Sequence, residues 1–144
     1  MENINDKLSD AALKGDAPRV KDLLRSPWCS PRVKSEHGIT ILMWAACSGS
    51  SACVELLLPV SDALEKDNEG ADALMCAATS KNATCIHLLL PASDASARDK
   101  IGRTALMYAA LHGRSVCTQA LIPVSDATAQ DKRGITALMY AAAY

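Results

Sequence analysis

One seven-residue string recurs along the chain at a fixed interval of 32 residues. The string "TALMYAA" occurs at 104–110 and 136–142, and the looser copies "DALMCAA" and "TILMWAA" occur at 72–78 and 40–46. Further columns keep the same interval: Gly38, Gly70, Gly102 and Gly134; Cys53, Cys85 and Cys117; Pro59, Pro91 and Pro123; and Asp67, Asp99 and Asp131. A fixed period of roughly 20–50 residues is typical of repeat architectures, in which each unit packs against its sequence neighbours.

The sequence of each 32-residue unit predicts two short helices. The first helix follows a Thr or Asp, residue types that cap helix N-termini, at Thr40, Asp72, Thr104 and Thr136. The pattern L-M-x-A-A then places leucine and alanine on one helical face. The second helix carries C-x-x-x-L-L/I and is expected to stop at the proline. Helices of about nine residues are unstable alone in water, so stability must come from stacking one helix pair on the next. The sequence therefore predicts an all-α solenoid of helix-turn-helix units.

The segment "DKIGRTALMYAALHG" (99–113), followed by "VCTQALI" (116–122), resembles the ankyrin repeat. The family pattern is D-x-x-G-x-T-P-L-H-x-A-A-x-x-G and then a helix of the form I/V-V-x-x-L-L. The resemblance implies one ankyrin-repeat domain, 1–144, of about four and a half repeats. Its expected parts are a degenerate N-terminal capping repeat with a long loop (repeat one, 5–34), three full repeats (repeats two, three and four: 35–66, 67–98 and 99–130) and a half repeat (repeat five, 131–144).

Two departures from the family pattern affect packing. The family's Pro is replaced by Ala or Ile, and its His by methionine at Met43, Met75, Met107 and Met139. In the family this His bonds to the loops. We therefore expect apolar packing to replace that hydrogen-bond network here.

Three columns could suggest a ligand site but are expected to be structural. The cysteine column spans layers about 10 Å apart, too far for a shared zinc with ~2.3 Å thiolate bonds or for disulfides, whose Cα atoms must lie within ~7 Å. One Asp per layer is too few for calcium, which takes roughly 6–8 oxygens, so these residues should cap their own turns: Asp62, Asp94 and Asp126. The aromatic column is expected to pack between layers, with a ligand-stacking stripe as the alternative: Trp44, Cys76, Tyr108 and Tyr140.

No group of residues suggests catalysis. The histidines His37, His87 and His112 fall at different repeat positions. The sequence has no Gly-rich phosphate loop, no H-E-x-x-H motif and no nucleophile elbow. We therefore expect no enzymatic activity, no cofactor, no metal and no small-molecule substrate.

Charge is divided unevenly along the chain. Residues 1–72 carry 8 Lys/Arg and 12 Asp/Glu, a net charge of −4, whereas residues 73–144 carry 7 Lys/Arg and 4 Asp, a net charge of +3. Neither half is basic enough to indicate nucleic acid. The start "MENINDKLSD" is unlike a signal peptide, and no apolar stretch approaches the roughly 20 residues of a membrane span. We expect a cytoplasmic protein with reduced cysteines and no membrane contact.

The resemblance implies a function in binding other proteins through the concave side, which is made of loop tips and exposed positions of the first helices. In this chain the expected partner-binding residues are Glu36, His37, Ile39, Glu69, Lys100, Ile101, Arg103, Leu111, His112, Lys132, Arg133 and Ile135. The alternative is that these residues only form the solvated face. The leading hypothesis is an interaction module or adaptor. A dedicated inhibitor or immunity protein, or the N-terminal part of a longer ankyrin protein, remain alternatives.

Two expectations concern the partner. The predicted face is acidic at Glu36 and Glu69 and basic from Lys100 onward, so we expect a protein with an acidic patch to dock on repeats four and five. The sequence also ends at Tyr144, after the first helix of a fifth repeat. An uncovered apolar layer there predicts either end-to-end self-association or fraying from residue 134 onward.

Overall fold

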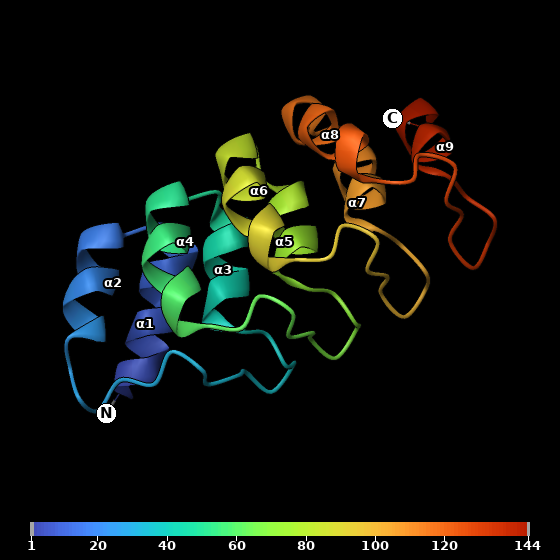
Figure 1. The fold of residues 1–144 in the computed structure, drawn as a ribbon. Coiled ribbons are helices and arrows are strands. Elements are labelled where there is room, and N and C mark those ends of the chain that lie inside the picture. Colours follow the sequence, from blue (N-terminus) through green and yellow to red (C-terminus); the bar gives the residue numbers. More distant parts are fainter. Residues whose placement is uncertain (1, 144) are drawn as a thin grey trace.

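The computed structural model describes residues 2–143, in which nine α-helices form two parallel stacks (Figure 1). The inner stack contains α1 (Ile4–Lys14), α3 (Ile41–Ser48), α5 (Ala73–Thr79), α7 (Ala105–Leu111) and α9 (Ala137–Ala142). The outer stack contains α2 (Ala17–Leu24), α4 (Ser51–Leu57), α6 (Ala83–Leu89) and α8 (Ser115–Leu121). Tyr144, on which the predicted last helix ends, lies outside the described residues.

Contacts between the helices are those of a solenoid. Helices α1, α3, α5 and α7 each pack on the outer helix that follows, and successive helices within each stack pack on one another. The long segments that precede α3, α5, α7 and α9 project from one side of the stack (Figure 1). The predicted all-α architecture of stacked helix-turn-helix units is confirmed.

The repeated Thr or Asp caps each of the last four inner helices, as predicted. Thr40 Oγ1 accepts from the Met43 amide at 3.2 Å, and Asp72 Oδ1 accepts from the Met75 amide at 2.9 Å. Thr104 and Thr136 make the same contact in the next two repeats. Because one of the free N–H groups at each helix start is satisfied in this way, the cap fixes where the helix begins.

The outer helices end differently from the expectation that proline stops them outright. Helices α4, α6 and α8 each pass directly into a 3₁₀ turn, and the proline occupies the second position of that turn: Leu58–Val60, Leu90–Ala92 and Ile122–Val124. Proline lacks an N–H group but has helical φ, so it is tolerated near the start of a new helical turn. The last helical turn is therefore a 3₁₀ turn, which is narrower than the α-helical turns before it.

The core consists of the repeated columns. The leucines and methionines of "LM" are at most 2% exposed in the first three copies: Leu42, Met43, Leu74, Met75, Leu106 and Met107. Apolar packing thus takes the place of the family's histidine, as expected. The cysteine column is also fully buried, at Cys53, Cys85 and Cys117, and burial raises the pKa of the Cys85 thiol to about 11. All six cysteines are free thiols.

The last copy of the string lies at the end of the stack and lacks a following layer in the described residues. Leu138 is 77% exposed and Met139 is 54% exposed, although both occupy columns that are buried elsewhere. Burial of these columns therefore depends on the neighbouring repeat. Among residues 2–143, none of the helices combines the length and the apolar character that crossing a bilayer requires.

Candidate functional site

A tight turn precedes each of the last three inner helices, and an aspartate side chain holds it. Asp67 Oδ1 accepts from the backbone amides of Glu69 and Ala71, both at 2.9 Å. Asp99 and Asp131 bond the equivalent amides in the next two repeats. The periodic aspartates thus set the shape of the loop tips that carry most of the predicted partner-binding residues.

Backbone hydrogen bonds join successive tips into a continuous row. The Asn68 amide donates to the His37 carbonyl at 3.0 Å, the Lys100 amide to the Glu69 carbonyl at 2.9 Å and the Lys132 amide to the Ile101 carbonyl at 2.9 Å. Because these bonds tie each tip to the next repeat, the row is held in register along the stack.

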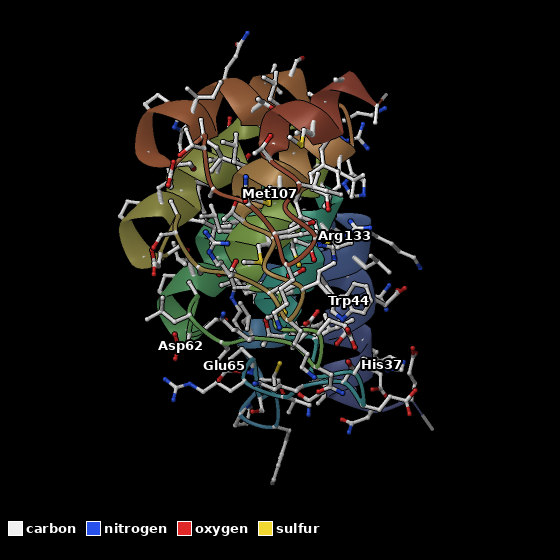
Figure 2. All side chains as sticks on the ribbon, turned by 90° about the vertical axis from the view of Figure 1, so that its right-hand side faces the viewer. His37, Trp44, Asp62, Glu65, Met107 and Arg133 are labelled. Carbon is white, nitrogen blue, oxygen red and sulfur yellow. The ribbon has the colours of Figure 1, made fainter. Side chains whose placement is uncertain are left out.

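The tips and the first helices form one surface, which we call the inner face: the loop tips 35–39, 67–71, 99–103 and 131–135 together with the accessible side of the inner stack. In Figure 2, His37, Trp44 and Arg133 lie on this side of the molecule, whereas Asp62 and Glu65 lie on the opposite side. Asp62 caps its own turn by accepting from the Leu64 amide at 2.9 Å, as expected.

All twelve predicted partner-binding residues are exposed or half-buried. The exposed ones are Glu36, His37, Glu69, Lys100, Ile101, His112, Lys132 and Arg133, and the half-buried ones are Ile39, Arg103, Leu111 and Ile135. Four of them surround one hollow: Glu69, Ile101, Arg103 and His112. The remaining eight do not line this hollow.

An aspartate, an arginine and a tyrosine form a cluster in repeat four. Asp99 Oδ2 accepts from Arg103 Nε at 2.9 Å and from the Tyr108 hydroxyl at 2.8 Å. Arg103 Nη2 also donates to the Tyr108 hydroxyl oxygen at 2.9 Å. The guanidinium lies 4.5 Å from the Tyr108 ring centroid, within the range of a cation–π contact.

Repeat five builds a similar cluster from a different arginine position. The Tyr140 hydroxyl donates to Asp131 Oδ2 at 2.6 Å, and Arg133 Nη2 donates to the Tyr140 hydroxyl oxygen at 2.8 Å. Arg133 stands two residues after its aspartate, whereas Arg103 stands four residues after Asp99. The tyrosine column therefore packs against the core, as predicted, but each hydroxyl also binds the carboxylate of its own turn.

Electrostatics of the clusters explain which cations remain available. The hydrogen bond from Tyr140, together with backbone amides, lowers the pKa of Asp131 to about 2 despite desolvation. At Asp99 burial opposes ionisation, but the bonds from Arg103 and Tyr108 outweigh it and lower the pKa. Arg103 is therefore part of a neutralised cluster, with 23% of its side chain exposed. Within the part of the chain that the structure describes, Lys100 and Lys132 make no ion pair.

Repeat three replaces both cluster partners with small residues. Ala71 stands at the position of Arg103, and Cys76 stands at the position of Tyr108. A hollow of about 330 Å³ opens beside them, lined by Cys47, Asp67, Glu69, Cys76, Arg103 and Tyr108, among others. Interaction with the Cys76 thiol lowers the pKa of Cys47, whereas interaction with Cys47 and burial raise that of Cys76.

The predicted partner-binding residues do not include several members of this hollow that carry a carboxylate, a thiol or a phenol hydroxyl: Cys47, Asp67, Cys76, Asp99 and Tyr108. Cys76 and Tyr108 were assigned to the column that packs between layers, and Asp67 and Asp99 were noted only for their period. One sequence pattern could have indicated the site. Asp and Tyr lie nine residues apart in repeats four and five, and Cys replaces that Tyr in repeat three.

The family model described as ankyrin repeats (3 copies) matches residues 8–100 and 82–144. No curated protein matches the chain.

Proposed function

The chain belongs to the ankyrin-repeat family, whose members generally bind other proteins, and we propose that it is a non-catalytic adaptor that binds a protein partner through its inner face. The observation that supports this proposal is the fixed row of loop tips, in which backbone bonds join His37, Glu69 and Ile101 to the next repeat. A surface that is ordered before binding loses less entropy when a partner docks. We also propose a cytoplasmic location.

Apolar and charged groups are mixed on the inner face in the way that protein interfaces require. Ile101 is 41% exposed at its tip, and Ile39, Leu111 and Ile135 are half-buried nearby on the same face. Charged side chains surround them. Apolar anchors supply affinity, and the charges around them set orientation and the rate of encounter.

Charge on the inner face supports a partner with an acidic patch that docks on repeats four and five. Lys100, Lys132 and Arg133 are exposed there. Nucleic acid fits this face less well, because Glu36 and Glu69 continue the same row and would repel phosphates. An inhibitor or immunity protein is the second candidate, and a single very tight partner, rather than several weaker ones, would favour it.

Reversing the available cations tests the docking proposal. Lys100→Glu combined with Lys132→Glu should slow association with a partner identified from source lysate about tenfold at low salt, because steering charges act mainly on the encounter rate. The loss should shrink as salt screens the charges. Arg103 is a poorer choice, because its reversal would also disrupt Asp99 and Tyr108.

The matched control carries the same charge change on the outer stack. Arg19→Glu combined with Lys21→Glu alters two exposed cations of α2 and should leave the association rate unchanged. Stopped-flow measurements at two salt concentrations give both rates. Equal rates for wild type and the Lys100/Lys132 variant at low salt would contradict docking on repeats four and five.

We further propose that the exposed end of the stack associates with a second copy of the chain or frays. Leu138 and Met139 present apolar surface there, 77% and 54% exposed respectively. Replacing both with lysine should shift a concentration-dependent dimer to monomer in sedimentation velocity. A strictly monomeric wild-type protein at high concentration, with slow amide exchange across α9, would contradict both alternatives.

A further inference from the structure

The three equivalent aspartates of the loop tips are not equally satisfied. Asp99 and Asp131 each use Oδ1 for two backbone amides and Oδ2 for a tyrosine hydroxyl and an arginine. Asp67 makes the same two Oδ1 bonds, to Glu69 and Ala71, both at 2.9 Å. Its carboxylate is therefore held in the same turn. Yet among residues 2–143 no donor reaches Asp67 Oδ2.

The missing partners leave room beside this oxygen. Ala71 and Cys76 occupy the positions of Arg103 and Tyr108, and the 330 Å³ hollow lies where the longer side chains would stand. Asp67, Ala71 and Cys76 all line it. The hollow is thus large enough to admit one long side chain from outside.

The charges that line the hollow favour a positively charged side chain as its occupant. Three carboxylates line it, those of Asp67, Glu69 and Asp99, against one guanidinium, that of Arg103. Arg103 is already committed to Asp99 and Tyr108 through bonds of 2.9 Å. A cation entering the hollow would therefore meet a net negative wall, on which Asp67 Oδ2 and the exposed Glu69 carboxylate have no partner among the described residues.

We propose that the hollow receives an arginine side chain of the protein partner, whose guanidinium pairs with Asp67 Oδ2 as Arg103 pairs with Asp99. Repeat four supplies the geometric template, because there an arginine satisfies the equivalent oxygen within the fold. A planar guanidinium fits a carboxylate with two parallel donors, whereas an ammonium is a point charge, so arginine suits this site better than lysine. The inference rests on the proposed function. The partner would then carry two recognition features: an arginine that enters repeat three, and the acidic patch proposed to dock on repeats four and five.

A small probe tests the pocket without knowledge of the partner. N-acetyl-arginine methylamide, titrated into the ¹⁵N-labelled full chain, should shift the Glu69 and Ala71 amides, since both bond the carboxylate that the probe would engage. The matched citrulline compound has nearly the same shape but no charge, and should give no saturable shift. Equal binding of the citrulline or lysine compound would overturn the assignment to arginine.

Two variants locate the site. Asp67→Asn keeps an oxygen for the turn amides but removes the charge, and should weaken probe binding about tenfold or more, the effect expected for loss of a charged hydrogen bond. The double change Ala71→Arg with Cys76→Tyr rebuilds the repeat-four cluster inside the hollow and should abolish probe binding in a protein that remains folded. Undiminished binding to either variant would overturn the proposal.

Comparison with the charge-reversal experiment separates the two proposals. If the arginine probe fails to bind while Lys100→Glu/Lys132→Glu still slows partner association, the arginine pocket is wrong and the inner face stands as the docking surface. If the probe binds at Asp67 but changes on the inner face never affect a partner, the proposed function is wrong. A partner that loses about tenfold in affinity on Asp67→Asn supports both.

Discussion

Leu74→Ala is expected to lower the free energy of unfolding by about 3 kcal/mol, within the range for fully buried leucines, whereas Leu138→Ala should change it by less than about 0.5 kcal/mol. The two leucines occupy the same position of the repeat, 64 residues apart. Leu74 is 0% exposed and Leu138 is 77% exposed. The difference arises because a following layer covers α5, whereas none covers α9 in the described residues.

Urea denaturation followed by circular dichroism measures both changes under identical conditions. The free energy of unfolding should fall for Leu74→Ala through the lost apolar burial and the cavity that remains. Comparable losses for the two variants would mean that Leu138 is also buried in solution, for example in a self-associated form. No loss for either variant would contradict the stacked core.

Gly70→Ala is expected to destabilise the protein by about 3 kcal/mol, and Gly134→Ala by only about 1–2 kcal/mol, the cost of a left-handed conformation for a residue with a Cβ atom. Both glycines have positive φ, +82° and +77°. A Cβ at Gly70 would lie 3.0 Å from the Lys100 backbone nitrogen and 3.2 Å from Asp99 Cα. At Gly134 the nearest atom would be 3.9 Å away.

The extra cost at Gly70 comes from the joint between repeats. The Lys100 amide that the new Cβ would crowd donates to the Glu69 carbonyl at 2.9 Å, so relief of the clash must lengthen that bond. The same denaturation measurement gives the comparison. A loss at Gly134 as large as the loss at Gly70 would show that backbone conformation alone, and not the contact between tips, requires glycine in this column.

Most of the fold could be predicted from the sequence, because the features that build it repeat. The Thr or Asp at each helix start caps the helix through contacts within its own turn, as at Asp72. The buried columns follow from the layer on either side, which presents the same residue types. The 3₁₀ turn at Pro59 was missed, because a missing N–H group indicates where an α-helix ends but not how the chain continues.

The candidate site was only partly predictable, because its geometry depends on departures from the period. Arg103 and Arg133 occupy different positions of their repeats yet reach equivalent tyrosine hydroxyls, so column comparison does not identify them as a pair. The two arginines were expected to be available cations, but in the structure both also serve local clusters. The hollow beside Asp67 results from residues that are small where their equivalents are large, and only the structure shows the space that they leave.

Site-specific photocrosslinking tests whether a protein partner binds the inner face. A benzophenone amino acid placed at Ile101 samples the inner face, and the same group at His87 samples the outer stack; both residues are exposed. With each variant incubated in source lysate, we expect one or more discrete crosslinked protein adducts from position 101 and none from position 87. Adducts from position 87 alone would contradict binding through the inner face.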